Sequence, residues 1–115
     1  VYCEFVYGPE HPDFGRGSFS WTTGSASWFW RGCLDNILGL QPVVGGLKID
    51  PSLPKSWKQL EITRQFRGAE YHIRIHNPFS INKGIDRIVV DGLLLTGNVI
   101  RPFSGGTHFV EVTLG

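Results

Sequence analysis

Regular alternation of apolar and polar side chains in two neighbouring segments limits this chain to a fold that contains antiparallel strands. From residue 71 to 76, apolar and polar residues alternate strictly, and an apolar parity also runs from Leu60 to Phe66, interrupted by Arg64. Arg67-Gly68 separates the two segments. Because successive side chains of a strand point to opposite faces, this pattern predicts a hairpin with one buried and one wet face.

Further strand signals follow toward the C-terminal end. Ile88–Val90 and Leu93–Leu95 flank Asp91-Gly92, a pair that favours a two-residue hairpin turn. A closing strand is expected over Val110, Val112 and Leu114. Short antiparallel strands in series predict a small β-sandwich or jelly-roll-like module from about residue 43 to 115. Three histidines are expected on its wet face: His72, His76 and His108.

One helix is predicted near the N-terminal end, beginning at Gly24 or Ser25. Thr22 and Thr23 precede it as candidate caps, and Gly39 followed by Pro42 gives a stop signal. Its apolar stripe consists of Ala26, Trp30, Cys33, Leu34, Ile37 and Leu38, with Trp28 and Phe29 partly off the stripe. A helix with large aromatic residues around so much of its circumference needs neighbours on several sides, which a chain of this length would not supply.

Charge and composition exclude several classes of protein. Eleven basic and ten acidic residues are dispersed along the 115 residues, so no basic stripe is predicted for nucleic acid or a membrane surface. No apolar run approaches the roughly 20 residues of a bilayer span. Cys3 and Cys33 are interpreted as reduced thiols in a cytoplasmic protein. The absence of methionine and the opening on Val1 lead us to expect a piece of a longer polypeptide.

The segment Ser20–Ala26 places hydroxyl groups and a glycine directly before the predicted helix. A helix N-terminus presents unpaired backbone N–H groups and the positive end of the helix dipole, so an oxyanion such as phosphate can bind there. Gly24 would let the anion approach the backbone. From local sequence alone, a simple capping role for Thr23 or Ser25 is the commoner case.

Several segments together resemble the cellobiose and chitobiose phosphorylase family, glycoside hydrolase family ninety-four, formerly glycosyltransferase family thirty-six. They are Gly8–Gly15, Ser20–Ala26, Ile37–Pro42, Gly46–Pro51 with Leu53-Pro54 and Trp57, and Phe66–Ile73. The resemblance implies a mainly β chain with an N-terminal helical segment. Residues 1–42 would be the end of an (α/α)6 catalytic barrel, and residues 43–115 a C-terminal β-sandwich domain.

The resemblance also implies a partial site. Thr23 and Gly24 match the family's phosphate-binding pair, and Glu4 stands where a Gln usually contacts the donor sugar. Phe19 is a second departure, since Asn is common there. The catalytic aspartate and the other phosphate ligands of the family lie upstream, so no catalytic residue and no metal ligand is expected here. His11 lies in a motif loop, where packing within the loop is the simpler role.

The reaction implied is phosphorolysis of a β-linked disaccharide or oligosaccharide, with inversion, to an α-sugar 1-phosphate. Inorganic phosphate is the co-substrate, and no cofactor is expected. The remainder of the parent enzyme and a second copy in a homodimer are the expected partners, and the isolated chain is expected to be inactive. The alternatives are a structural β-module and a non-catalytic carbohydrate-binding module with exposed aromatics among Trp28, Trp30 and Trp57.

Overall fold

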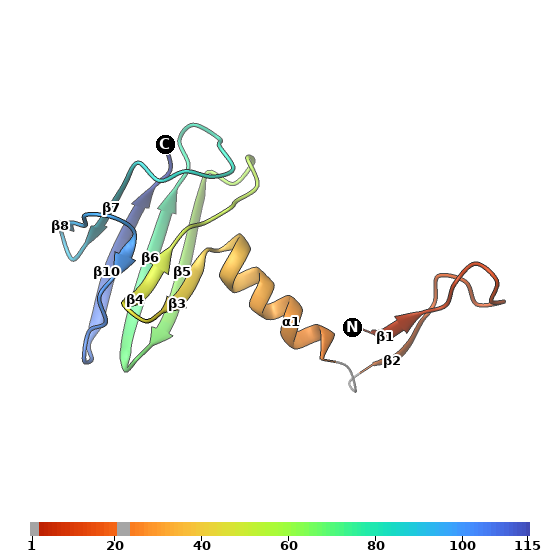
Figure 1. The fold of residues 1–115 in the computed structure, drawn as a ribbon. Coiled ribbons are helices and arrows are strands. Elements are labelled where there is room, and N and C mark those ends of the chain that lie inside the picture. The colour runs from red at the N-terminus through yellow and green to blue at the C-terminus, as the bar shows by residue number, and fades with distance from the viewer. Residues whose placement is uncertain (1–2, 21–23) are drawn as a thin grey trace. The chain divides into compact units, whose positions relative to one another are not determined.

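The computed structural model describes residues 3–20 and 24–115, most of them in strands, with one short α-helix (Figure 1). The chain divides into two compact units, residues 1–33 and residues 34–115. The smaller unit holds a β-hairpin and the helix, and the larger unit holds two further sheets. The predicted β-rich character is therefore confirmed.

The helix α1 (Ser25–Gly32) begins where the sequence predicts but ends earlier than the apolar stripe suggests. A π-helical segment, η1 (Cys33–Ile37), continues it, so the prediction of one α-helix up to Leu38 is wrong. Gly32 occupies the last α-helical position, and glycine is among the poorest helix formers. Gly39, at φ +66°, then reverses the chain in a conformation that suits glycine.

Large aromatic side chains on α1 have little cover from the described residues. Trp28 is 80% exposed, and Phe29 and Trp30 are also exposed. None of the residues of α1 is buried. The expectation of a helix whose aromatic side chains stay largely exposed is confirmed for the described residues.

The larger unit consists of two sheets. The five-stranded sheet has the order β5-β6-β10-β7-β8, and the three-stranded sheet has the order β3-β4-β9. Their bounds are β3 Leu40–Val43, β4 Gly46–Ile49, β5 Gln59–Phe66, β6 Ala69–His76, β7 Arg87–Val90, β8 Leu93–Leu94, β9 Val99–Ile100 and β10 Thr107–Thr113.

Both hairpins predicted from turn signals are confirmed. β5 and β6 pair antiparallel across Arg67-Gly68, and β7 pairs with β8 across Asp91-Gly92. Asp91 and Gly92 both have positive φ, as a two-residue hairpin turn requires. In each case a local pair of residues fixes the turn, which explains why the sequence reveals it.

A further hairpin, β3–β4, lies where the sequence indicates mainly a Pro/Gly-rich connector. Its strands pair antiparallel, with Leu40 opposite Ile49, and β9 adds to its other edge. Gly46 has φ +146°, and a Cβ there would lie 1.9 Å from the carbonyl oxygen of Ile100. Only glycine therefore permits this approach of β4 to β9.

The last strand, β10, departs from the expected all-antiparallel series. It lies between β6 and β7, parallel to β6 and antiparallel to β7 (Figure 1). Apolar alternation is the same for a strand of either direction, so the sequence gives no sign of the parallel pairing. The strand joins the two predicted hairpins into one sheet.

One apolar cluster fills the space between the two sheets of the larger unit. It comprises Leu40, Leu47, Ile49, Leu53, Phe66, Ala69, Tyr71, Ile73, Ile75, Ile88, Val90, Ile100, Val110, Val112 and Leu114. Tyr71 is the largest fully buried side chain, and its hydroxyl accepts a hydrogen bond from the backbone N–H of Phe103 at 3.3 Å. The larger unit is therefore a β-sandwich with a continuous core.

The three histidines of the sandwich do not share one face. His72 and His76 alternate with core residues of β6, as predicted. His108 lies opposite Tyr71 on β10, on the same parity as Val110, so its placement on the wet face is wrong. Its side chain is 16% exposed, and its ring stacks on Phe103 at 3.6 Å. Parity counted from Val110 shows this directly.

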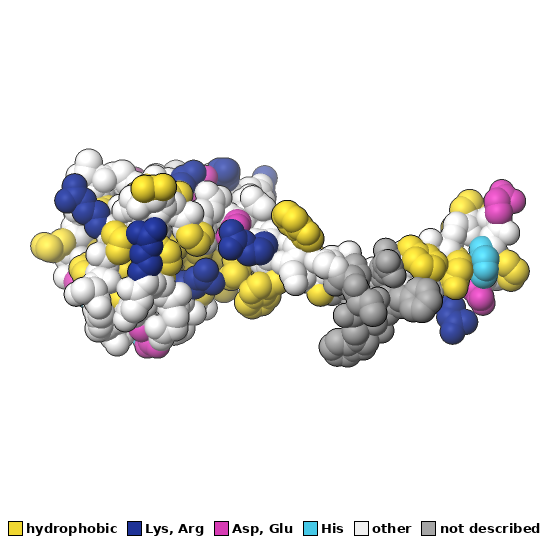
Figure 2. Space-filling model, turned by 60° about the horizontal axis from the view of Figure 1, so that its bottom comes forward, with side chains coloured by type: hydrophobic (Ala, Val, Ile, Leu, Met, Phe, Trp, Pro, Cys, Tyr) yellow, Lys and Arg dark blue, Asp and Glu magenta, His cyan; other side chains and the backbone are white. Residues whose placement is uncertain are grey.

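Charged side chains are dispersed over the sandwich. On the face drawn in Figure 2, apolar and uncharged atoms separate the Lys and Arg side chains from one another. Within residues 3–20 and 24–115, no helix combines the length and the apolar character needed to span a bilayer.

Candidate functional site

The hairpin of the smaller unit positions one end of the candidate site. β1 (Cys3–Val6) pairs antiparallel with β2 (Gly17–Ser20), with Cys3 opposite Ser20 and Phe5 opposite Ser18. The backbone of Glu4 therefore faces that of Phe19, although fifteen positions separate them. Pairing brings Glu4 to the same end of the hairpin from which the chain leaves for α1.

The N-terminus of α1 forms the other end. Gly24 is the N-cap residue, with right-handed helical backbone angles, and no side chain among residues 3–20 and 24–115 caps the helix there by a hydrogen bond that involves Gly24. Its carbonyl oxygen accepts the first helical hydrogen bond, from the N–H of Trp28 at 3.1 Å. Only residues 21–23 separate Ser20 from Gly24, so the hairpin end and the helix N-terminus are joined by a short segment.

Nothing among the described residues requires glycine at position 24. Its φ of −71° suits any residue, and a Cβ added there would have Trp28 Cδ1 as its nearest atom, at an ordinary contact distance of 3.8 Å. Among the described residues, no atom outside the neighbouring helix backbone therefore lies closer than 3.8 Å to the place of a Cβ at position 24. Such a helix N-terminus can bind an oxyanion through backbone N–H groups.

The predicted site residues can be placed only in part. Gly24 lies at the helix N-terminus, as the sequence predicts. Thr23 and the side chain of Glu4 lie outside the residues that the structure describes. Gly24 is the N-cap residue of α1, and the capping alternative for Thr23 or Ser25 stays a prediction. Sequence reasoning missed the proximity of Glu4 to this end of the hairpin, which the antiparallel register supplies.

The loop between β1 and β2 is held by its own residues. The ring of His11 stacks on Tyr7, with centroids 4.0 Å apart, and His11 Nδ1 accepts the backbone N–H of Asp13 at 3.1 Å. Because Nδ1 is an acceptor, the neutral ring carries its proton on Nε2. Arg16 and Asp13 form an exposed ion pair at 3.7 Å. These contacts give His11 the packing role expected from the sequence.

A second polar cluster lies in the sandwich, around His108. Its Nδ1 lies 2.7 Å from Asp91 Oδ2, and its Nε2 lies 3.0 Å from the carbonyl oxygen of Gly105. Both neighbours are acceptors, so the doubly protonated ring satisfies both. The hydrogen bond to Asp91 raises the pKa of His108, and the same bond, with the N–H of Phe109, lowers the pKa of Asp91.

His108 connects the turn at Asp91 with the turn at Gly105. Both of its ring nitrogens are used in these contacts, so neither is available to bind a substrate. No group of three or more His, Cys, Asp or Glu side chains in the described part of the chain has the arrangement of a metal site. The arrangement best suited to a ligand in the smaller unit is therefore the helix N-terminus at Gly24. Its chemistry is the binding of an anion.

Two segments of the chain each match the model of a known protein family. Residues 1–39 match the model of the catalytic domain of the glycosyl hydrolase 94 superfamily, and residues 40–80 match the C-terminal domain of glycosyl hydrolase family 65. The two matches meet at the start of β3.

Similarity to individual phosphorylases extends along the chain. An N,N'-diacetylchitobiose phosphorylase of Vibrio proteolyticus is 38% identical over 99% of the chain. A solabiose phosphorylase and a 3-O-beta-D-glucopyranosyl-beta-D-glucuronide phosphorylase, both of Paenibacillus borealis, are 32% and 36% identical over 99% and 91% of the chain. The chain spans 14%, 15% and 13% of the length of these three relatives, respectively.

Proposed function

Because the chain is a homologue of glycosyl hydrolase 94 disaccharide phosphorylases over nearly all of its length, we propose that it belongs to a longer enzyme that cleaves a β-linked disaccharide or oligosaccharide with phosphate. The cleavage proceeds with inversion and yields an α-sugar 1-phosphate. The segment before β3 completes an (α/α)6 barrel, and the sandwich that begins with β3 forms the C-terminal domain of that enzyme. The enzyme acts as a cytoplasmic homodimer.

The observation that carries this proposal is the helix N-terminus at Gly24, one short segment away from the hairpin end that holds Glu4. Phosphate accepts hydrogen bonds from the backbone N–H groups of α1 and from the hydroxyl of Thr23. Glu4 contacts the donor sugar. The two ligands then meet at this end of the hairpin, as attack of phosphate on the sugar requires.

This chemistry needs one protein carboxyl group. In an inverting glycosidase, one carboxylic acid protonates the leaving oxygen and a second carboxylate activates water. Phosphate is itself the nucleophile in phosphorolysis, so the base that activates water is dispensable. The proton donor lies in the rest of the enzyme, and this chain contributes binding groups.

The test is to incubate the full-length parent enzyme with N,N'-diacetylchitobiose or cellobiose, with and without inorganic phosphate. Proton NMR of the products should show an α-sugar 1-phosphate only when phosphate is present. The 115-residue chain in the same assay should release none. Hydrolysis to two free sugars, a β-anomer, or turnover by the isolated chain would contradict the proposal.

A further inference from the structure

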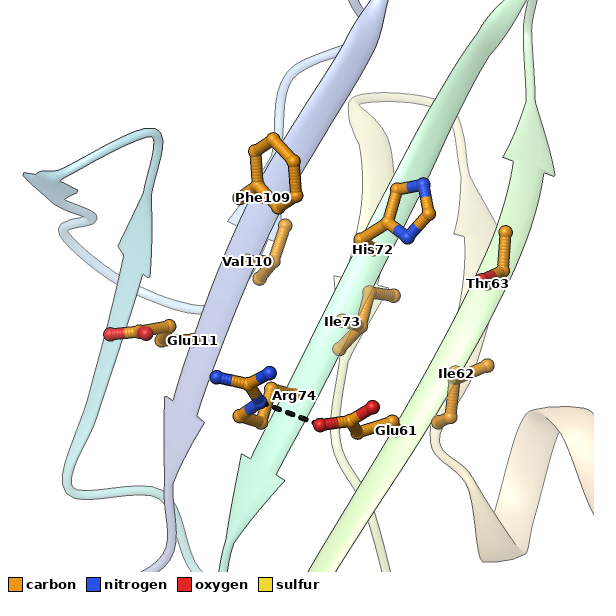
Figure 3. Close-up of a pocket in the computed structure, with 9 residues that line it drawn as sticks. All are labelled: Glu61, Ile62, Thr63, His72, Ile73, Arg74, Phe109, Val110 and Glu111. Carbon is orange, nitrogen blue, oxygen red and sulfur yellow. Dashed lines mark hydrogen bonds and ion pairs between the residues drawn. The ribbon is translucent and has the colours of Figure 1, made fainter.

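A groove of about 220 Å³ lies on the outer face of the sandwich, remote in sequence from Gly24 (Figure 3). Three adjacent strands, β5, β6 and β10, form its floor. The side chains that rise from the floor alternate with core residues, so they are not needed to fill the core. They are Glu61, Thr63, His72, Arg74, Phe109 and Glu111.

These side chains form two rows across the strands. The register places Thr63 beside His72 and His72 beside Phe109, a row that combines a hydroxyl, an imidazole and a phenyl ring. The next row combines Glu61, Arg74 and Glu111, in which a guanidinium lies between two carboxylates. Two residues along a strand separate the rows by about 7 Å.

The first row presents an apolar platform. Phe109 is 62% exposed, and its ring stacks on that of His72 with centroids 5.5 Å apart. Figure 3 shows the two rings side by side on neighbouring strands. His72 Nε2 lies 2.7 Å from Glu70 Oε1, which holds the imidazole in place. An aromatic surface fixed in this way can receive the C–H face of a flat ligand.

The second row presents donors and acceptors next to the platform. Arg74 donates from Nε to Glu61 Oε1 at 2.8 Å, and the dashed line in Figure 3 marks this bond. The two terminal nitrogens of Arg74 donate to no side chain within residues 3–20 and 24–115. The carboxylate of Glu111 likewise has no hydrogen-bond partner among these residues. Ligand hydroxyl groups can therefore both donate and accept here.

The charge balance decides between classes of ligand. Glu61, Glu70 and Glu111 outweigh Arg74 around the groove, so a phosphate, a nucleic acid or an acidic peptide would be repelled. A neutral ligand with one C–H face and many hydroxyl groups satisfies both rows. A sugar ring has this chemistry.

We propose that the outer face of β5, β6 and β10 is a binding site for a neutral β-linked oligosaccharide, separate from the phosphate site. The sugar face stacks on Phe109 and His72, and its hydroxyls bond Arg74 and the neighbouring carboxylates. The choice of a β-linked saccharide rests on the proposed function. A site of this kind would hold a longer substrate chain near the enzyme between turnovers.

The experiment is a titration of the isotope-labelled 115-residue chain with cellotetraose, followed by its amide NMR signals. Saturable shifts are expected for residues of both rows. Phe109→Ala should weaken binding about tenfold, since a stacked aromatic contact is worth about one decade in affinity. Phe79→Ala is the matched control, because Phe79 is 72% exposed but lies outside the groove. Arg74→Met provides a second variant that removes the free donors.

Absence of saturable shifts, shifts that map to another surface, or equal affinities of the Phe109 and Phe79 variants would overturn the inference. Hydrogen exchange of the full-length enzyme adds a second check. If the amides of this face exchanged more slowly in the full-length enzyme than in the 115-residue chain, without any saccharide, the face would be a contact with another part of the enzyme and the inference would be overturned. Binding by the isolated chain does not depend on phosphorolysis, so failure of the proposed function would be seen separately.

Discussion

The side chain of Asn77 bonds both backbone polar groups of Ile81. Its Oδ1 accepts the N–H of Ile81 at 3.0 Å, and its Nδ2 donates to the Ile81 carbonyl oxygen at 2.8 Å. The same Nδ2 also donates to the carbonyl oxygen of Trp57 at 3.1 Å. Asn77 has no exposed surface, so its buried side chain holds the loop after β6 in place through these hydrogen bonds.

Asn77→Ala should therefore destabilise the sandwich by about 2–4 kcal/mol, because buried backbone groups lose their partners at about 1–3 kcal/mol each. Urea denaturation of the 115-residue chain measures the change. Asn36→Ala, at an exposed position of η1, is the control and should change the free energy of unfolding by no more than about 0.5 kcal/mol. Equal stabilities of the two variants would show that water replaces the Asn77 bonds.

His108 should make stability depend on pH. Its pKa is raised in the folded state, so its contribution is complete below the unfolded pKa, about 6.5, and is lost as pH rises through the folded value. The pKa of Asp91 is lowered, so its contribution is lost as pH falls below about 4. Thermal melts of wild type and His108→Gln should converge as the pH is raised through the folded pKa of His108.

His76→Gln is the control for that series, because His76 lies on the opposite face of the sheet from His108. Its melting temperature should keep the wild-type pH profile. A His108→Gln profile parallel to wild type from pH 5 to 9 would contradict the role of the His108–Asp91 pair.

Gly46→Ala should disrupt the three-stranded sheet, because its Cβ would collide with the Ile100 carbonyl oxygen at a positive φ. We expect a loss of at least about 3 kcal/mol, typical of severe backbone strain and steric conflict. Gly45→Ala is a matched control in the same turn, where the nearest atom to the new Cβ is Val99 Cγ1 at 3.8 Å. Chemical denaturation should leave Gly45→Ala near wild type; an equal loss in both variants would point to general loop sensitivity.

In the full-length enzyme, Thr23→Val should weaken transition-state binding of phosphate by about 1.5–3 kcal/mol, or about 10- to 100-fold in rate. Gly24→Val should place a branched side chain where the anion would approach the backbone of α1, and reduce the rate at least as much. Initial rates over a range of phosphate concentrations measure both effects. Ser27→Ala, on the exposed surface of the same helix, serves as control. Unchanged phosphate kinetics in both site variants would show that Thr23 and Gly24 only begin the helix and do not bind phosphate.

Local signals account for the parts of the structure that the sequence predicts. The alternation through Tyr71 and Ile75 and the turns at Arg67-Gly68 and Asp91-Gly92 each depend on residues close in sequence. The start of α1 beside Gly24 is equally local. These elements can be identified from the sequence because turn chemistry and side-chain periodicity act over a few residues.

Long-range pairing accounts for what the sequence does not reveal. The parallel register of Val110 with Ile73 and the approach of Glu4 to the end of β2 both join distant segments. Side-chain alternation does not depend on the direction of a strand or on its partner, so neither of these two pairings could be predicted. The outer-face groove has the same origin, since Phe109 and His72 become neighbours only through β10.

The central position of β10 also bears on the order of folding during synthesis. The β5–β6 and β7–β8 hairpins can form as soon as each leaves the ribosome, but neither is hydrogen-bonded to the other, and only Thr107–Thr113, inserted between them, joins them into one sheet. Until then, β6 and β7 each present an unpaired edge that can recruit strands from other chains. A nascent chain that ends before residue 107 would therefore expose both edges and be prone to aggregation. Completion of the five-stranded sheet depends on β10.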